Sequence, residues 1–247
     1  MYNLLKLSSC LASTLLLGLV AFPALEGGRS PISQEQWGEP VQAATPKPIQ
    51  WSPERGRGSA GGTLSGGRRG TDSQCAVGDV AAQMTLLVPD DAAGLLTTVA
   101  NPALYWHVET ARPVSMTFVL QDVTAAQPVY TQVVTAKQSG ITGVQLPTHV
   151  ALQVGAKYRW GVFLACGEQE TSEMYARSFI QRVEAVAVRS QAQGQSPVTQ
   201  AAVYAQAGIW YDAVSPLVQA VKTDPSNEQA KVGLKSLLAQ AKKSLPL

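Results

Sequence analysis

The chain has 247 residues, which is enough for one or two domains with a sizeable buried core. Charged residues make up 15% of it, against about 25% in typical soluble domains, and this composition favours a β-rich extracytoplasmic protein over a cytosolic enzyme. The net charge is +2, and the twelve basic and twelve acidic side chains from Cys75 onward cancel. The basic excess therefore lies before Cys75, and the sequence predicts no basic nucleic-acid-binding patch on the body of the chain.

The N-terminus resembles a secretory signal peptide spanning residues 1–24. Lys6 supplies a positive n-region, and the apolar run at 11–22 has the length of an h-region. This run is shorter than the about 20 apolar residues that a membrane-spanning helix needs. Cleavage could fall at Ala24 or as late as Ala43, where the small-x-small pattern is better. We predict an exported protein, periplasmic or associated with the cell envelope, with no transmembrane span in the mature chain.

Residues 25–74 are rich in Pro, Gly, Ser, Gln and Arg and have little apolar periodicity, which predicts a disordered linker. Within it, the stretch ERGRGSAGGTLSGGRRGTDSQC raises the question of a phosphate or nucleic-acid site. Gly61 and Gly66 have the spacing of a phosphate-binding loop, but Gly67 stands where that loop needs Lys. No aromatic residue accompanies the arginines for stacking on bases. We interpret the stretch as a mildly cationic tether that could touch anionic lipid or polysaccharide.

From Cys75 onward, short apolar runs recur between turn signals such as Asn101-Pro102 and Arg112-Pro113. The expected strands are Ala82–Val88, Ala103–Glu109, Val114–Asp122, Val129–Ala136, Thr142–Leu146, Lys157–Cys166 and Met174–Glu184. Alternation is clearest in KYRWGVFLAC, where Tyr158, Trp160 and Cys166 share one face. About seven strands at this spacing predict an all-β antiparallel sandwich of the immunoglobulin type over residues 75–184.

Two cysteines remain once the signal peptide is removed, Cys75 and Cys166. In an oxidising compartment such a pair favours a disulfide, which would close a loop of about 90 residues. Two separate buried thiols are the alternative. The pair is a disulfide candidate.

The C-terminal part reads as helical. Residues 185–196 are a polar connector, and Ser196-Pro197 is a helix start with Ser as N-cap and Pro at the first helical position. Small and large residues between Gly208 and Pro225 then follow the spacing of the second helix of a tetratricopeptide repeat, although Pro216 interrupts it. A third helix is expected from about Asn227. The segment 197–243 is thus predicted to be one tetratricopeptide-type helix pair plus a capping helix.

One repeat cannot form a stable array by itself, so its apolar face must pack on the sandwich or on another protein. The candidate partner-docking residues are Tyr204, Trp210, Tyr211, Asp212 and Leu217. Covering one face of the sandwich is the structural alternative for these helices.

A catalytic, cofactor-binding or metal-binding constellation is not found in the sequence. His107 alternates to the face opposite Trp106 and is expected to be exposed, and His149 follows Pro147 in a loop. Metal-ligand spacing and a nucleophile elbow are both missing. A sugar-binding sandwich or a weak glycan-acting enzyme stays as the alternative function. It would use exposed tyrosines with acidic partners, namely Tyr105, Tyr130 and Tyr175 with Asp90, Asp91 or Glu109.

Several stretches of the sequence, taken in their order along the chain, together resemble the cyanobacterial "domain of unknown function 928" family. They are the Arg/Gly segment before Cys75, LYWHV, MTFVLQD with PVY, GVQLP, YRWGVFLAC, and VYAQAGIWYDAVSPL, of which AGIWYDAV at Ala207–Val214 is the most specific. The likeness runs from about Arg55 to Leu238. It implies an exported protein with a β domain and a short helical tail, and it transfers no activity and no catalytic residue.

The function that these observations favour is a non-enzymatic binding or scaffold module of the cell envelope, docking another envelope or secreted protein. The helices over 198–243 would supply the docking surface, as tetratricopeptide-like helices do for peptides. Polysaccharide is the other expected partner, and nucleic acid is not expected.

Overall fold

The computed structural model describes residues 48–53, 64–66, 75–77, 80–90, 95–166 and 172–246. These residues all belong to the compact unit Thr45–Leu247. The predicted signal peptide at 1–24, both cleavage positions and most of the predicted tether lie outside the described residues.

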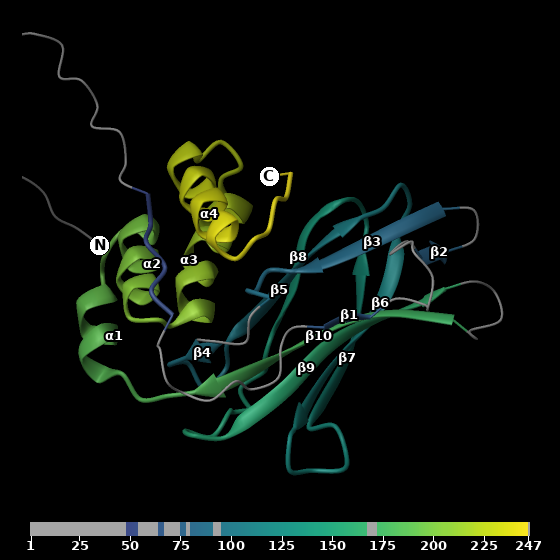
Figure 1. Ribbon diagram of the computed structural model, residues 1–247, viewed down its shortest axis with the longest axis horizontal. Coiled ribbons are helices and arrows are strands. Elements are labelled where there is room, and N and C mark those ends of the chain that lie inside the picture. Colours follow the sequence, from purple (N-terminus) through teal and green to yellow (C-terminus); the bar gives the residue numbers. More distant parts are fainter. Residues whose placement is uncertain are drawn as a thin grey trace, which may run out of the picture. The chain divides into compact units, whose positions relative to one another are not determined.

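The described residues form two β-sheets (Figure 1). One has the order β1-β10-β9-β6-β7, with β4 paired in parallel at the end of β10, and the other has the order β2-β3-β5-β8. The strands are β1 (Leu64–Gly66), β2 (Cys75–Val77), β3 (Val80–Leu86), β4 (Leu96–Thr97), β5 (Ala103–Glu109), β6 (Val114–Asp122), β7 (Tyr130–Ala136), β8 (Gly140–Gln145), β9 (Lys157–Cys166) and β10 (Ser172–Arg182). All seven predicted strands are present. The three short strands β1, β2 and β4 lack a periodic apolar pattern and were not predicted.

The two sheets bury the alternating residues that the sequence indicated. Trp106 of β5, Phe118 of β6 and Trp160 of β9 are essentially inaccessible to solvent. The ring of Phe118 lies 6.2 Å from that of Trp106 and 6.1 Å from that of Trp160, measured between centroids. These rings join the smaller sheet to the larger one, so the β region has a sandwich-like core.

His107 is buried, with 2% of its surface exposed, and the expectation of an exposed side chain was wrong. The strand β5 lies between β3 and β8, and every residue from Ala103 to Val108 is buried. Alternation predicts one solvent-facing side only when that side of the sheet is uncovered. Here the outward-facing Tyr105 is covered by α3, whose Gln219 donates a hydrogen bond to its hydroxyl at 3.1 Å.

Four helices follow the sheets in the chain: α1 (Val186–Ala192), α2 (Pro197–Gln206), α3 (Trp210–Thr223) and α4 (Glu228–Gln240). The predicted helix starts are confirmed, because Ser196 caps α2 with Pro197 in its first turn and Asn227 caps α4. The polar connector at 185–196 is instead partly helical, since it contains α1, which has no side-chain cap and only one buried residue, Ala192. None of the helices in the described residues is both long and apolar enough to cross a membrane.

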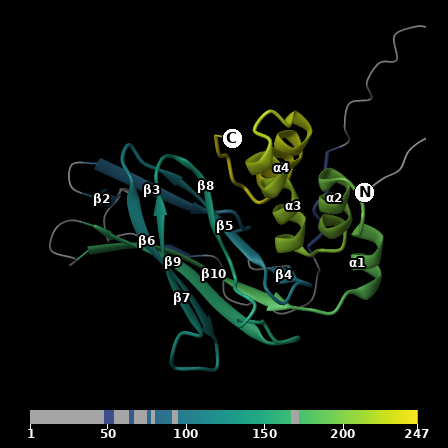
Figure 2. The ribbon, with the colours of Figure 1, turned by 180° about the vertical axis from the view of Figure 1, so that it is seen from behind.

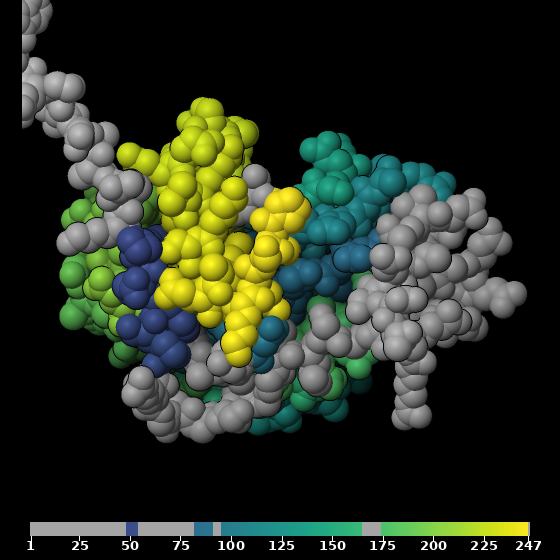
Figure 3. Space-filling model, turned by 45° about the horizontal axis from the view of Figure 1, so that its top comes forward, coloured from purple at the N-terminus to yellow at the C-terminus, as the bar shows by residue number. Residues whose placement is uncertain are grey.

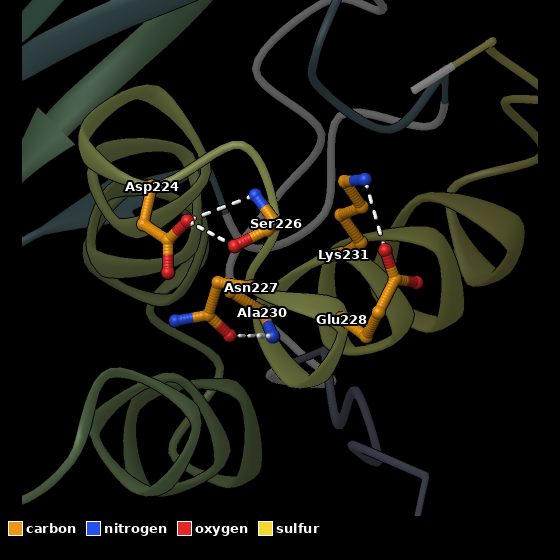
Figure 4. Close-up of polar contacts among 6 residues, drawn as sticks. All are labelled: Asp224, Ser226, Asn227, Glu228, Ala230 and Lys231. Atoms are coloured by element: carbon orange, nitrogen blue, oxygen red, sulfur yellow. Dashed lines mark hydrogen bonds and ion pairs between the residues drawn. The ribbon is translucent and has the colours of Figure 1, made fainter.

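The turn from α3 to α4 is fixed by local hydrogen bonds (Figure 4). The carboxylate of Asp224 accepts from the backbone N–H and the hydroxyl of Ser226 at 2.9 and 2.6 Å. Asn227 Oδ1 then accepts from the N–H of Ala230 at 2.9 Å and begins α4. Such short polar side chains favour turns and helix starts because they replace missing backbone partners. They hold α4 at the angle at which it meets α3.

The structure describes two parts of the predicted linker. Leu64–Gly66 pairs antiparallel with β10, and residues 48–53, which we call the strap, lie against the helices. In Figure 3 the strap, in dark blue, lies between the green helices and the yellow α4, and Figure 2 shows the same helices from behind. Two large apolar side chains, Ile49 and Trp51, alternate with polar neighbours in this short stretch and pack on the core.

Candidate functional site

Helix α3 begins with three consecutive side chains that each bond to a different part of the β region. Trp210 is fully buried, and its Nε1 donates to the carbonyl oxygen of Leu87, just after β3, at 2.8 Å. A buried indole N–H needs such a partner because an unmade bond there is costly. Trp210 therefore fixes α3 to the smaller sheet.

Tyr211 connects the same helix to the larger sheet. Its hydroxyl accepts from Nε1 of Trp160 at 2.7 Å and donates to the carbonyl oxygen of Phe179 at 2.6 Å. Burial raises the pKa of the Tyr211 hydroxyl far above its usual value, and the hydrogen bonds with Trp160 and Ser178 act in the opposite direction. The hydroxyl stays neutral and serves as a structural bridge.

Asp212 completes the series by bonding to β4 and the residue after it. One carboxylate oxygen accepts from the Thr97 hydroxyl at 2.6 Å, and the other accepts from the backbone N–H of Thr98 at 2.8 Å and from its hydroxyl. Burial raises the pKa of Asp212, while these hydrogen bonds favour the charged form. The carboxylate is 6% exposed and its oxygens are already occupied by these donors, so it is not placed to act as a general base.

These contacts revise the interpretation of the docking candidates. Trp210, Tyr211, Asp212 and Leu217 are all buried inside the protein. The first three bond helix α3 to the β region, and Leu217 packs beside Gly233 of α4. Tyr204 alone is partly exposed, and it lines a pocket of about 300 Å³ between α2, α3 and the start of β5. Of the five docking candidates, four are thus buried and one is partly exposed, and their docking role stays a prediction.

The strap occupies a groove formed by α2, α3 and α4. Ile49 is 2% exposed. Its Cδ1 lies so close to Gly233 of α4 that a Cβ added to this glycine would be only 3.2 Å from it. Leu217 of α3 closes the other side, since the same Cβ would lie 3.2 Å from its Cδ2. Gly233 is thus the residue that leaves room for Ile49 between two helices.

The strap backbone is held by hydrogen bonds that do not depend on its side chains. The amide of Gln240 donates to the carbonyl oxygen of Ile49 at 2.6 Å and accepts from the N–H of Trp51 at 2.7 Å. The N–H of Ser52 donates to the carbonyl oxygen of Ala205 in α2 at 3.1 Å. Main-chain hydrogen bonds of this kind are how a protein binds an extended peptide without depending on its side chains.

Trp51 adds a ring contact to this grip. Its ring meets that of Trp210 edge to face, with centroids 4.8 Å apart and planes at 84°. The groove therefore holds an extended segment by its main chain and by the side chains of Ile49 and Trp51. The sequence signal that could have revealed the strap is a pair of large apolar residues two positions apart. This pair lies between prolines within a polar linker.

The residues of the predicted sugar site are not brought together. Tyr105 is buried under α3, Tyr130 lies on β7 and Tyr175 lies on β10. Among the acidic candidates, Asp90 pairs with Lys243 and Glu109 lies 3.9 Å from His107, while Asp91 is outside the described residues. His149 packs edge-on to Tyr130. Within the described ranges there is no group of three or more residues that could hold a metal ion.

The structure places the two cysteines by their backbone only. Cys75 opens β2 opposite Ala82, Cys166 ends β9 opposite Ser172, and β2 runs close to β9 although the two strands belong to different sheets. The side chains of both cysteines lie outside the described residues, so the disulfide stays a prediction.

A family model matches most of the chain. Residues 64–244 match the model of the family described as Domain of Unknown Function (DUF928). Neither a curated protein nor a solved structure matches the chain. The matched range starts with β1 and includes the Trp210-Tyr211-Asp212 series, but not the strap.

Proposed function

The chain belongs to the Domain of Unknown Function (DUF928) family, and from its geometry we propose that it is an exported, non-enzymatic binding or scaffold module that docks another cell-envelope or secreted protein. The docking site is the groove of α2, α3 and α4. The single observation that carries this proposal is the Gln240 amide bonded to both Ile49 and Trp51, with Ile49 inserted beside Gly233.

The strap represents the ligand that this groove accepts. An extended segment offers its carbonyl and N–H groups to Gln240 and Ala205, and places one aliphatic and one aromatic side chain on the helices. A partner segment with the same pattern would make the same contacts. The partner chemistry is therefore an extended peptide with an aliphatic residue followed two positions later by an aromatic one.

The strap is held weakly enough to be exchanged. Burial of Ile49 contributes about 2 kcal/mol, the partly buried Trp51 a similar amount, and each backbone hydrogen bond about 1 kcal/mol. Ordering the six residues of the strap costs about 1 kcal/mol or more for each residue. Because these quantities nearly cancel, a partner segment with one further contact can replace the strap.

In this proposal the sheets act as a scaffold of the immunoglobulin type, and α2 and α3 act as a tetratricopeptide-type pair capped by α4. The signal-like residues 1–24 direct the chain out of the cytoplasm, so the groove meets envelope or secreted proteins. N-terminal sequencing of the protein from an exported fraction tests this part. A mature chain that begins at or before Ala44 retains the strap.

The docking proposal is tested with a labelled peptide, PKPIQWSPE, which copies residues 46–54. The variant Ile49→Asp/Trp51→Ser releases the strap and should bind the peptide at least about tenfold more tightly than the wild type, whose groove is occupied at a local concentration in the millimolar range. Adding the substitution Gln240→Ala, at an exposed position, should remove this gain in affinity for the peptide. A peptide of the same composition in scrambled order is the control.

Circular dichroism must show that each variant is folded. A folded variant with a released strap that does not bind the peptide contradicts the proposal, and so does binding that survives Gln240→Ala together with Gly233→Leu. Tyr105, Tyr130 and Tyr175, first considered for sugar binding, are not assembled into one site, so a sugar site made of these three residues is not proposed.

A further inference from the structure

The outward face of strands β9 and β10 carries a row of aromatic and cationic side chains. The side chains that alternate with them, among them Trp160, Val162 and Ile180, are buried in the core. The row consists of cross-strand neighbours, all half-buried except the buried Gly161: Arg159 opposite Phe179, Arg177 opposite Gly161, and Phe163 opposite Tyr175. Because cross-strand partners share a face, all of these side chains point away from the core.

The rings and guanidinium groups of this row are stacked on one another. The Phe163 and Tyr175 rings lie 6.0 Å apart with planes at 28°. The Arg177 guanidinium lies 5.7 Å from the Tyr175 ring centre, and that of Arg159 lies 5.8 Å from the Phe179 ring centre. A guanidinium that stacks on a ring keeps the N–H groups at its edges free to bind an oxyanion in bidentate fashion.

Gly161 lies in the middle of the row and is itself buried beneath its neighbours. A Cβ at this position would meet the carbonyl oxygen of Ala176 at 3.1 Å, Arg177 Cβ at 3.3 Å and Phe163 Cε2 at 3.4 Å. Along the strands, the Phe163–Tyr175 pair lies on one side of Gly161 and the Arg159–Phe179 pair on the other. The row thus presents an apolar platform and a cationic one along the strand direction.

The charge of this face is positive. Lys157 is exposed on the same side of β9, and within the described residues neither Arg159 nor Arg177 forms an ion pair with a carboxylate. On the neighbouring β6, the half-buried Gln121 lies opposite Arg159 and offers a further polar group. The nearest acidic residue in the register of β10 is Glu173, at the end of that strand opposite Ala165.

We propose that this face binds an acidic polysaccharide. The Arg159 and Arg177 guanidinium groups would hold carboxylate groups of successive sugar units, and the Phe163 and Tyr175 rings would receive the apolar face of a sugar ring. In this row, aromatic rings and guanidinium groups follow one another along a strand. A linear polymer with repeating negative charges has the charge and the repeat that such a row can bind. This inference is independent of the peptide groove, which lies on α2, α3 and α4.

The test uses the exported full chain and polygalacturonate as the probe, with neutral dextran and anionic phosphatidylglycerol vesicles as comparison ligands. The variant Arg159→Gln/Arg177→Gln should weaken polygalacturonate binding by at least about tenfold, as loss of two charge-assisted contacts does. The control Arg112→Gln/Lys137→Gln removes the same charge at exposed positions elsewhere and should change binding by less than about twofold. Gly161→Val, whose side chain would press on Phe163 and Arg177, should displace these groups and weaken binding without changing the charge.

Each variant is first shown to be folded by its thermal transition. Binding to polygalacturonate that is lost in the Arg159/Arg177 variant and kept in the control supports the proposal. It is overturned if the wild type does not bind polygalacturonate, if dextran binds equally well, or if both double variants lose the same affinity. Binding to the vesicles in preference to polygalacturonate would assign the face to a lipid surface and would also overturn it.

Discussion

The hydroxyl of Tyr211 joins helix α3 to two strands at once, accepting from Trp160 Nε1 on β9 and donating to the Phe179 carbonyl on β10. Trp160 is itself part of the aromatic core between the sheets. The helices are therefore anchored in the same core as the strands, and the groove that they form is held rigidly against the β region.

Removing this hydroxyl should destabilise the whole fold. In Tyr211→Phe, the Trp160 N–H and the Phe179 carbonyl both lose a buried partner, and we expect the free energy of unfolding to fall by about 2–4 kcal/mol. Urea unfolding followed by tryptophan fluorescence measures this. The matched control is Tyr130→Phe, whose hydroxyl donates to Gln132 at an exposed position and should matter by less than about 0.5 kcal/mol. Equal effects of the two substitutions would contradict a bridging role for Tyr211.

A chain that ends at Gln195 should not fold as an independent β domain. The truncation exposes Trp160 and Leu87 and leaves the Thr97 and Thr98 hydroxyls without Asp212. We expect aggregation, or a loss of the cooperative thermal transition, in place of a stable sandwich. The measurement is differential scanning calorimetry of the truncated and full chains. A truncated chain with a sharp transition close to that of the full chain would show that the helices are a detachable module.

Much of the fold could be predicted because it follows local rules. Alternation in KYRWGVFLAC and its neighbours gave the strands, and Ser196-Pro197 gave the start of α2, since both depend on nearest neighbours in the chain. The role of Trp210-Tyr211-Asp212 could not be found in this way. Their hydrogen-bond partners lie far away in the sequence. In addition, the same residue pattern fits both buried anchoring residues and an exposed docking surface.

Stability should also decrease at mildly acidic pH because of His107. Burial lowers the pKa of His107 below its usual 6.5, and nearby Glu109 opposes this shift only in part. The unfolded chain takes up a proton as the pH falls through 6.5, while the folded chain does not until its own lower pKa is reached. The stabilisation is thus complete above pH 6.5 and is lost as the pH falls toward the folded-state pKa.

The check is urea unfolding of the wild type and His107→Gln at pH 7 and pH 5. The wild type should lose more unfolding free energy between these two values than the variant does. The same loss in both proteins would mean that His107 does not contribute to the pH dependence.

The proposed disulfide between Cys75 and Cys166 would connect the two sheets through β2 and β9. If it forms, the intact mass of the exported protein rises by two hydrogens on reduction, and Cys75→Ser/Cys166→Ser is less stable by about 4 kcal/mol in the chain-entropy view. Free thiols that react with iodoacetamide in the folded, unreduced protein would contradict the pairing. Peptide mapping without reduction identifies the linked residues directly.

The strap and the buried His107 mark the limit of sequence-based prediction in this chain. The composition of residues 25–74 predicts disorder, and Ile49 and Trp51 are too few to overcome that signal unless the groove is already known. The burial of His107 likewise depends on what covers the outer side of the smaller sheet. Both outcomes are decided by contacts between distant segments, which local patterns do not contain.

The most direct test of the central claim is whether the strap exchanges with a peptide in the unmodified protein. Amide hydrogen exchange, read by mass spectrometry, reports on the N–H groups of Trp51 and Ser52, which bond to Gln240 and Ala205. We predict partial protection of residues 49–52 in the free protein and its loss when excess Ile-x-Trp peptide is added. Protection that is unchanged at saturating peptide would contradict the claim and show that the strap is a permanent part of the fold.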